Sequence, residues 1–446
     1  MRLLHTSDWH LGRSLHRADL REAQAGFIDH LVGTVRSEKI DAVLVAGDVY
    51  DRAIPPVDAV ALCEEGLVRL RDAGARVIVI SGNHDSARRL GFGSALVDAS
   101  GVHLRTRVRS LAEPVMLRDR HGPVAVYGVP YLEPYAVRGE LPPAAPGAAC
   151  QADTGTARGD SRGGGDARCG DGSAAHGNGG HSGAALRAPG HAGVLGEAIR
   201  SVRADIAARG GVRAVVMAHA WVAGGEGSDS ERDISVGGVA RVPAALFGGF
   251  SYVALGHLHG QQTLAGHLRY SGSPLPYSFS EASHAKGSWL VELGADGAAR
   301  AERVPAPVPR KLSVLRGTLG ELLTSDAYTR HERDFLSVTL TDPGRPEFAM
   351  ERLRRRFPHV LVLTFEPEGA GSDRRDYRAR VAGRGDLAIA AEFVAHVRNT
   401  PVTAGERALL AAAFEEVRRA GGEPAPARAA RGEPAPARAA RGKEGD

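Results

Sequence analysis

Cysteine and long apolar runs are scarce in this chain, and each scarcity excludes a class of protein. Three cysteines occur among 446 residues, and none has the CxxC spacing of a zinc knuckle. This usage predicts neither a zinc knuckle nor a disulfide framework, and it fits the reducing cytoplasm, where we expect the protein. No run approaches about 18 uninterrupted apolar residues, so no membrane span is expected. The first residues hold no apolar signal segment, because His5 and Asp8 interrupt it.

Lysine is also scarce, since four lysines stand among 56 basic residues and the rest are arginine. Such a bias is typical of a GC-rich genome and is no evidence for a particular chemistry. The net charge of +4 permits a nucleic-acid partner without arguing strongly for one.

Short apolar runs recur along the chain, and each is a candidate buried strand: 3–6, 42–46, 77–81, 124–129, 214–218 and 252–255. Residues 20–38 and 57–73 carry apolar side chains at helical spacing between the early runs. Strands that alternate with such helices predict a layered α/β core with a mixed sheet. Later segments at 267–271 and 288–293 are expected to be antiparallel strands at the edge of a sandwich.

Composition divides the chain into four parts. The main domain is predicted over 1–305, with a disordered insertion at 139–191 that is rich in Gly, Ala, Asp and Arg. Its histidines, His176, His181 and His191, could bind metal adventitiously, but a solvated linker is the simpler interpretation. A small α/β domain is predicted over 310–382, with strands at 335–340 and 360–364 and a helix at 346–357. Two amphipathic helices over 386–420 precede a disordered tail, 421–446, that repeats one decamer.

The two C-terminal helices have recognisable starting signals. Asp386 could cap the first helix, and Thr403 with Glu406 forms a capping-box pattern for the second. The apolar stripes of these short helices need a partner, which is either this protein's own domain or a helix of another chain.

Polar side chains that can bind metal follow five of the predicted strands. They are Asp8 and His10, Asp48, Asn83 with His84 and Asp85, His219, and His257 with His259. A single motif of this kind is usually a turn or a structural histidine, but five in succession are hard to obtain by chance. Loops at the carboxyl ends of strands in layered α/β folds converge on one crevice.

The types of ligand point to a particular chemistry. Carboxylate, amide and imidazole together suit Mn²⁺, Fe²⁺ or Zn²⁺ better than Ca²⁺, and there are too many for one ion. Two such ions about 3.5–4 Å apart clamp an in-line displacement at phosphorus. Asp48 is predicted to bridge them, because a short carboxylate on a Gly-Asp turn can be reached from both sides. Gly47, Gly82 and Gly256 precede the clusters and permit unusual backbone angles or close approach.

The motifs, taken in order, resemble the calcineurin-like metallophosphoesterases. Longer segments resemble the family of D (nuclease) subunits of bacterial SbcCD exonucleases: HTSDWHLGR, VLVAGDVYDRAIPP, SGNHDSARRL, SDSERDISVGG and YSGSPLPYSFSEASH. The resemblance covers residues 1 to about 420, apart from 139–191. It implies a four-layer αββα metallophosphoesterase sandwich with a small α/β capping domain and C-terminal helices.

The resemblance also implies roles for individual residues. One metal would be held by Asp8, His10, Asp48 and His259, and the other by Asp48, Asn83, His219 and His257. His84 would be the catalytic residue that faces the scissile phosphate and protonates the leaving 3′ oxygen or stabilises charge there. Asp85 would orient His84 or its loop, although a plain turn-forming Asp is almost as good an explanation. Arg52, Arg88 and Arg89 could contact DNA phosphates, although exposed arginines usually contact nothing.

The function implied by the resemblance is that of a Mn²⁺-dependent double-strand exonuclease and single-strand endonuclease. Its partners would be an SbcC-type coiled-coil ATPase, docked on 386–420, and double-stranded DNA ends and hairpins processed in repair, recombination and replication. A homodimer of nuclease subunits within a heterotetramer is expected, with dimer helices in 55–100. Two alternatives remain open: a small-molecule phosphodiesterase on the same fold, which would need neither cap nor helices, and a silent scaffold, against which the intact ligand set argues.

Overall fold

The computed structural model describes residues 1–137, 139–141, 190–231, 241–368, 383–398 and 400–420. Most of the expected insertion and the whole expected tail therefore lie outside the described residues. The chain divides into two compact units. Unit 1 comprises Met1–Leu315, Arg330–Ser337 and Phe357–Val362, and unit 2 comprises Arg316–Thr329, Val338–Arg356 and Leu363–Asp446. The domain boundaries expected from composition remain a proposal.

Unit 1 contains two six-stranded sheets. In the order of the strands, the first sheet consists of β14 (Ala299–Pro305), β13 (Gly287–Leu293), β1 (Arg2–Thr6), β4 (Ala42–Ala46), β5 (Arg76–Ile80) and β6 (Val102–Leu104). The second consists of β11 (Gln262–Ala265), β12 (Leu268–Tyr270), β10 (Tyr252–Gly256), β9 (Arg213–His219), β8 (Gly122–Val129) and β7 (Val115–Asp119). Both sheets mix parallel and antiparallel pairs, as the sequence predicts.

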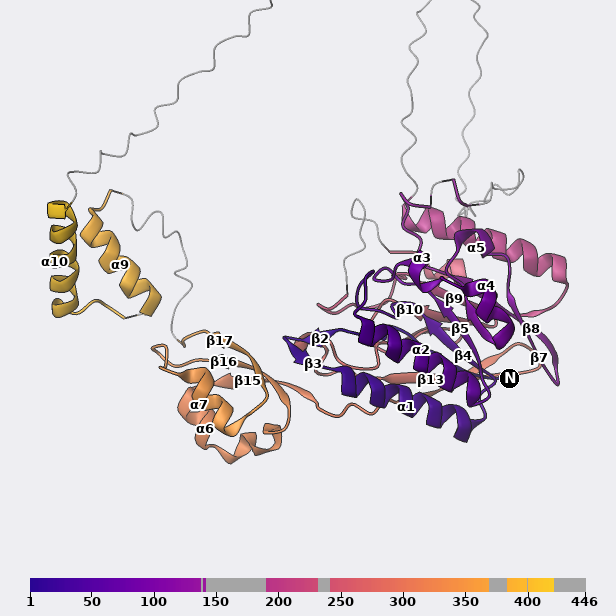
Figure 1. Ribbon diagram of the computed structural model, residues 1–446, viewed down its shortest axis with the longest axis horizontal. Helices are drawn as coiled ribbons and strands as arrows, with labels where there is room; N and C mark the ends of the chain where they lie inside the picture. Colours follow the sequence, from indigo (N-terminus) through magenta and orange to yellow (C-terminus); the bar gives the residue numbers. More distant parts are fainter. Residues whose placement is uncertain (138, 142–189, 232–240, 369–382, 399, 421–446) are drawn as a thin grey trace, which may run out of the picture. The chain divides into compact units, whose positions relative to one another are not determined.

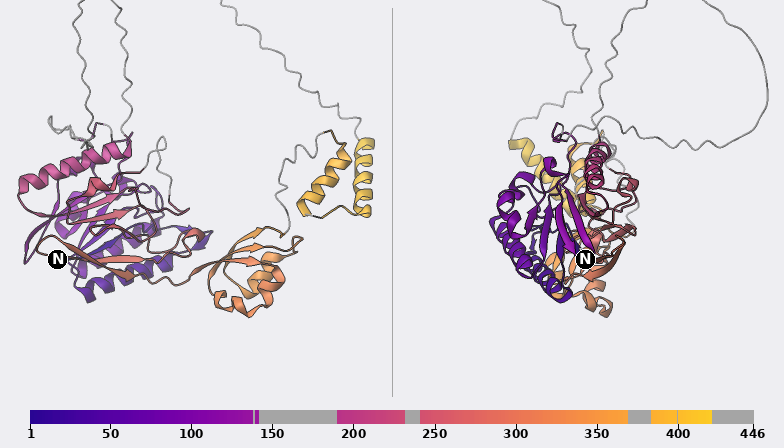
Figure 2. Two further views of the ribbon diagram at one scale, coloured as in Figure 1. Left: turned by 180° about the vertical axis from the view of Figure 1, so that it is seen from behind. Right: turned by 90° about the vertical axis from the view of Figure 1, so that its right-hand side faces the viewer.

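Helices cover the outer face of each sheet. Helices α1 (Arg21–Glu38) and α2 (Val57–Asp72) lie on one side of the strands, and α5 (His191–Arg209) lies on the other (Figure 1). The view from behind shows the same arrangement (Figure 2). Shorter elements complete the unit: β2 (Ser14–Leu15), β3 (Ala18–Asp19), α3 (Ala87–Leu90), α4 (Ser94–Val97), and the 3₁₀ helices η1 (Asp98–Ser100), η2 (Val108–Ser110), η3 (Ala244–Phe247) and η4 (Phe279–Glu281).

The alternation of side chains along the strands separates three layers of core. Val43 and Val45 of β4 pack with α1 and α2, whereas Leu44 of the same strand packs between the sheets with Met217 of β9. Val216 of β9 faces the opposite way, into the core beneath α5. Because successive strand residues point to opposite faces, each sheet is buried on both sides. The predicted four-layer αββα sandwich is confirmed.

Two expectations about this unit need correction. The expected antiparallel pairing is present for β13 with both neighbours and for β12 with β11, but β12 also pairs parallel with β10, and β12 and β13 lie in different sheets. The chain reverses at the β11–β12 hairpin, so β12 returns in the direction of β10. His191 does not lie in a solvated linker, because it begins α5 and is buried.

A three-stranded sheet with its own helices follows, and a pair of helices comes after it. The sheet has the order β15 (Leu312–Gly317), β16 (Phe335–Leu340), β17 (Val360–Phe365), with helices α6 (Leu319–Thr324) and α7 (Ala349–Arg356) and the 3₁₀ helix η5 (Asp326–His331). Helices α9 (Asp386–Arg398) and α10 (Ala404–Ala420) match the predicted pair. The capping box is confirmed, since Thr403 N donates to Glu406 Oε2 at 2.8 Å and Glu406 N donates to Thr403 Oγ1 at 3.3 Å. Among the described residues, no helix has the length and apolar character needed to cross a membrane.

Candidate metal centre

Five strand ends of unit 1 supply the eight predicted site residues. β1, β4 and β5 are adjacent parallel strands of one sheet, and β9 and β10 are adjacent parallel strands of the other. Parallel neighbours end at the same edge of their sheet, so the loops that follow them meet. The side chains come, in that order of strands, from Asp8 and His10, Asp48, Asn83 and His84, His219, and His257 and His259.

The backbone of these loops is held in an unusual conformation. Asp8, His10, Asp48 and His257 have φ values of 52°, 45°, 49° and 107°, a region that residues with a side chain seldom adopt. The first two loops are tied together, because Asp8 N donates to Gly47 O and His10 N donates to Asp48 O, both at 3.0 Å. Strain of this kind persists only where the surroundings enforce it, and it is common at functional sites.

Glycine is required at two positions around these ligands. Gly47 has a φ of 92°, and an added Cβ would lie 2.4 Å from His219 Nδ1. At Gly82 an added Cβ would lie 2.1 Å from Asp48 Oδ1. The sequence argument for glycine as a means of close approach is therefore confirmed at both positions.

Asp48 lies between two groups of possible ligands. Its Oδ2 is 3.7 Å from His10 Nε2 on one side and 3.5 Å from His219 Nε2 on the other. On the first side, Asp8, His10 and His259 bring one ligand atom each within 4.8 Å of one another. Asp8 also forms a group of this kind with Asp48 and His219, which links the two sides. All five side chains are buried.

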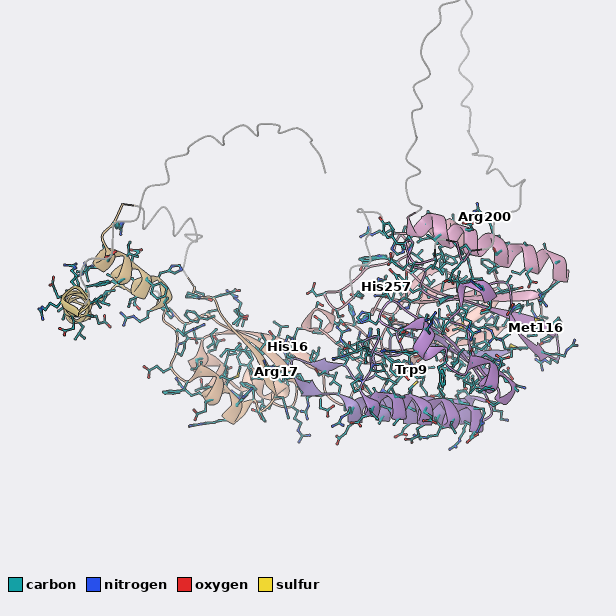
Figure 3. The ribbon with its side chains drawn as sticks, turned by 45° about the horizontal axis from the view of Figure 1, so that its top comes forward. Trp9, His16, Arg17, Met116, Arg200 and His257 are labelled. Carbon is teal, nitrogen blue, oxygen red and sulfur yellow. The ribbon has the colours of Figure 1, made fainter. Side chains whose placement is uncertain are left out.

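On the second side, Asn83 joins two imidazoles. Its Oδ1 is 2.9 Å from His219 Nε2 and 3.1 Å from His257 Nδ1. His219 Nδ1 donates to the backbone oxygen of Ala46 at 2.9 Å, so Nε2 is the nitrogen that faces the other ligands. His257, whose position in unit 1 Figure 3 shows, also donates its backbone N–H to Asp8 Oδ1 at 3.0 Å.

His84 stands beside the ligands rather than among the buried ones, because it is half-buried. Its Nδ1 donates to Asp51 O at 2.8 Å, so Nε2 is left to take up or release a proton. Its backbone N–H donates to Asp48 Oδ1 at 2.9 Å, and its ring meets the ring of His10 edge-on at 4.7 Å between centroids. His84 also forms a close group with His10 and Asp48.

Asp85 does not contact the His84 ring. Its carboxylate accepts the backbone N–H groups of Val49, Tyr50 and Gly82 at 2.9–3.1 Å. It therefore ties the loop after β5 to the loop after β4, which is the loop-orienting alternative of the sequence prediction. Burial and the charge of Asp48 raise the pKa of Asp85 to about 7.

The charges at the centre depend on one another. Burial raises the pKa of Asp8 to about 6. Burial alone would also raise the pKa of Asp48, but the charges of His219 and His10 outweigh it and hold this pKa well below its usual range. Burial alone would lower the pKa of His219, whereas the carboxylates of Asp48 and Asp8 raise it to about 9. Desolvation keeps the pKa values of His10 and His257 well below normal.

The donor set fits divalent cations. His10 Nε2 and His259 Nε2 face each other at 3.1 Å, so a cation between them could take the place of the proton that the two nitrogens otherwise share. His10 Nδ1, Asn83 Nδ2 and His257 Nε2 are buried and have no hydrogen-bond partner among the described residues. Imidazole, carboxylate and amide oxygen together suit borderline divalent ions.

Several residues that are not among the predicted ligands surround the centre. Ser7 Oγ donates to Asp8 Oδ2 and lies 2.7 Å from Ser271 Oγ. Ser230 and Glu281 contact His259, and Lys286 pairs with Glu281. Both Glu281 and Ser271 lie in the YSGSPLPYSFSEASH segment, but no local signal separates them from its other polar residues. Trp9, which Figure 3 labels, is buried and packs against Phe27.

A cleft with a volume of about 860 Å³ adjoins the centre at Asn83 and Asp85. Three exposed arginines, Arg88, Arg107 and Arg109, contribute to its walls, together with two glutamates. Arg89 donates to the backbone oxygen of Ala53, at 3.0 Å, and is not part of this lining. Positive side chains beside a metal centre can hold a phosphate backbone.

Two family models match the chain. Residues 1–133 match the model described as calcineurin-like phosphoesterase, so this part of the chain belongs to the calcineurin-like phosphoesterases. Residues 308–398 match SbcD_C, described as the type 5 capsule protein repressor C-terminal domain. The two matches in this order confirm the resemblance to the D subunits of SbcCD.

These matches establish a coarse function. The chain is a phosphoester hydrolase of a family that uses divalent metal ions, and it carries a domain found in SbcD-type nucleases. The first match ends at residue 133, before His219, His257 and His259. The structure is what brings those three histidines to the ligands of the matched region.

Proposed function

We propose that this protein is a Mn²⁺-dependent DNA nuclease that works as one subunit of an ATP-dependent complex. The observation that carries the proposal is the position of Asp48, whose Oδ2 lies 3.7 Å from one imidazole and 3.5 Å from another, each within a separate ligand group. That is the arrangement required of a carboxylate shared by two cations.

We assign the ligands by those two groups. Asp8, His10, Asp48 and His259 would hold one ion, and Asp48, Asn83, His219 and His257 would hold the other. The close group of Asp8, His10 and His259 supports the first set, and the contacts of Asn83 with His219 and His257 support the second. When bound, the two ions would supply positive charge that polarises a water molecule and the phosphate oxygens.

His84 is proposed to act on the leaving group. Its Nδ1 proton is held by Asp51 O, so the ring cannot turn freely and Nε2 faces a fixed direction. A half-buried imidazole beside the ligands can protonate the 3′ oxygen as the P–O bond breaks, or stabilise the charge on it. Asp85 contributes by holding the two loops that carry Asp48 and His84 in register.

DNA as substrate is supported by two observations. The SbcD_C match is to a domain named after a DNA nuclease family, and the arginine-lined cleft at Asn83 offers positive charge beside the metal centre. Double-stranded ends and hairpins are the proposed substrates, cut in repair, recombination and replication. The low cysteine content supports a cytoplasmic location.

Partners are proposed for two exposed apolar surfaces. Helices α9 and α10 expose Phe393, Val397, Leu409 and Val417, which would dock on an SbcC-type coiled-coil ATPase. In unit 1, Val57 of α2 is 82% exposed and Phe92 is 88% exposed, and they would lie in the interface of a nuclease homodimer. Two nuclease and two ATPase subunits would make a heterotetramer.

A paired assay tests this function. The full chain is incubated with linear duplex DNA and, separately, with a chromogenic phosphodiester, first with Mn²⁺ and then with EDTA. We expect Mn²⁺-dependent cleavage of DNA that EDTA stops, and that the ATPase partner with ATP accelerates. Cleavage of the chromogenic ester alone, even with partner and ATP present, would favour the small-molecule phosphodiesterase.

A further inference from the structure

We infer that the buried pair Glu281–Lys286 is a positioning device for His259, which keeps the proton of the imidazole on Nδ1 and directs Nε2 toward Asp8 and His10. The inference rests on the proposed metal site, of which His259 would be a ligand. It concerns two residues that neither the motifs nor the family assignment accounts for.

The contacts of the His259 ring determine which nitrogen carries a proton. Nδ1 lies 3.1 Å from Glu281 Oε1 and 2.8 Å from Ser230 Oγ. A carboxylate oxygen can only accept a hydrogen bond, so the proton belongs on Nδ1. The other nitrogen, Nε2, then has a lone pair and faces His10 Nε2 at 3.1 Å. A carboxylate behind a metal-binding imidazole fixes the ring and makes it a better ligand.

Lys286 holds Glu281 in place from the opposite side. Its Nζ pairs with Glu281 Oε2 and donates to the backbone oxygen of His259 and to Ser273 Oγ, both at 2.9 Å. The ammonium therefore touches both the carboxylate that orients the ring and the backbone that carries the ring. Three donors with three acceptors leave the lysine little freedom to move.

Stability does not explain why this pair is buried. Glu281 is 1% exposed and Lys286 is 7% exposed. The free energy needed to remove two charges from water can equal or exceed the free energy gained from their attraction. Well-packed apolar residues in the same place often give the fold the same stability. A directional role is a sufficient reason to keep the pair, because a carboxylate held at this place selects the Nδ1 proton.

The two other histidines at the ends of β9 and β10, His219 and His257, have no carboxylate behind the ring in the described residues. His219 uses a backbone carbonyl, Ala46 O, for its Nδ1 proton. His257 presents Nδ1 itself to Asn83 Oδ1, and its Nε2 has no partner among the described residues. Of these three histidines, His259 is thus the one whose ring contacts a charged side chain that is not itself a proposed ligand. Loss of the Glu281 contact should therefore weaken binding at the ion position that includes His259 and leave the other position unchanged.

Two variants test the inference in the full-length chain. E281Q replaces the carboxylate by an amide that can donate as well as accept, and E281Q/K286M also removes the buried charge that E281Q leaves unpaired. E231Q is the matched control, because Glu231 Oε1 accepts the backbone N–H of His259 at 2.8 Å and does not contact the ring. The double variant guards against a fold that fails for lack of charge balance.

Two measurements are made on each protein. Mn²⁺ titration by calorimetry reports both ion positions, and ¹⁵N-histidine NMR of the metal-free protein reports the His259 tautomer, with its signals assigned by loss in H259Q. We expect wild type and E231Q to show two ions and a protonated Nδ1. In E281Q/K286M, one ion should bind about 10–100-fold more weakly, with the tautomers mixed.

The outcomes separate the inference from the proposed function. If the double variant folds, binds both ions with wild-type affinity and keeps the proton on Nδ1, the positioning role of Glu281 is overturned. If wild type itself binds no Mn²⁺, the proposed function fails. The tautomer measurement needs no metal, so it still decides for or against the Glu281–His259 contact.

Discussion

Two regions of this molecule depart from the usual pattern of burial in opposite ways. Around the strand ends of unit 1, polar groups such as Asp8, His10 and Asp48 are buried together. On α9 and α10, apolar groups such as Phe393 and Leu409 are exposed, at 55% and 72%. Both arrangements cost free energy in the isolated chain, either by desolvation or by wetting of apolar surface.

The difference between the two regions indicates what each is made to meet. The buried polar groups are directional, since lone pairs of imidazole, amide and carboxylate converge within a few ångströms, and small cations satisfy them. The exposed apolar groups lie along helices, and apolar contacts do not require a particular direction. An apolar surface of another protein can therefore cover them. We therefore expect mutations in the first region to reduce DNA cleavage, and mutations in the second region to weaken binding to a partner protein.

The largest effect is expected for Asp48 in the first region. D48N removes the charge between the two ligand groups and should lower DNA cleavage by about 10³-fold or more, since several kcal/mol of charge stabilisation are lost. Mn²⁺-dependent cleavage of linear duplex DNA measures this, and calorimetry should show weakened ion binding. D58N, on the exposed start of α2, is the matched control and should keep full activity. Normal cleavage by D48N would contradict a shared ligand.

His84 should separate chemistry from metal binding within the same region. H84A is expected to lower cleavage by about 10²–10⁴-fold, because a positioned proton donor is lost, while both ions remain bound. Single-turnover cleavage and Mn²⁺ calorimetry are measured on the same preparation. Loss of both ions from H84A would refute the role at the leaving group, and would make His84 a ligand.

Asp119, a half-buried carboxylate that is paired with a cation, extends the comparison. Asp119 accepts from Arg213 Nη1 at 3.1 Å and Nη2 at 2.5 Å, and hydrogen bonding to that guanidinium holds the pKa of Asp119 well below its usual range. D119N should lower the free energy of unfolding by about 1–3 kcal/mol at neutral pH, because it leaves Arg213 without its charge partner. Cleavage per folded molecule should not change.

The pH dependence of that effect follows from the sign of the shift. A depressed pKa in the folded state stabilises the protein above the unfolded value of about 3.9, and the contribution disappears as pH falls through the folded value. The difference between wild type and D119N should therefore be full at pH 7 and shrink below about pH 4. Denaturant unfolding across this range measures it, and a constant difference would exclude the ion pair as the cause.

The smallest effect on the isolated chain is expected in the second region. L409S and V417S change exposed side chains of α10 and should alter stability by no more than about 0.5 kcal/mol. Binding to an SbcC-type ATPase should nevertheless weaken about tenfold or more, if these side chains are interface anchors. R407Q, on the same helix, is the control. Undiminished binding by both serine variants would remove α10 from the proposed interface.

Much of the fold follows from local patterns of the sequence. The apolar runs that begin near residues 3, 42, 77, 214 and 252 are strands of the structure, and the four-layer arrangement follows from their alternation with helices. The helix α5 was not predicted, because it borders a segment without large apolar side chains. The parallel pairing of β12 with β10 was not predicted, because a three-residue strand contains too little pattern to show both of its neighbours.

For the candidate site, the sequence predicts the ligands but not the contacts that position them. Residue types such as Asp8, Asn83 and His219 could be read from their places after apolar runs, since chain direction and strand length already put them at one edge of a sheet. The positioning contacts could not, because Glu281 and Lys286 acquire a role only through their distance from His259. Likewise, the sequence left open whether Asp85 orients a loop or only forms a turn, and the three backbone N–H groups that it accepts decide between these roles.

The sequence by itself determined which groups could bind metal and which strand ends would carry them. The spacing of apolar residues, and the polar residues that follow each apolar run, are local properties of the chain. Only the tertiary structure decided that Asp48 lies between two imidazoles, which nitrogen of His259 keeps its proton, and which buried charge holds it there. The physical reason is that tautomers, shared ligands and ion pairs depend on atoms a few ångströms apart in space that come from distant parts of the chain.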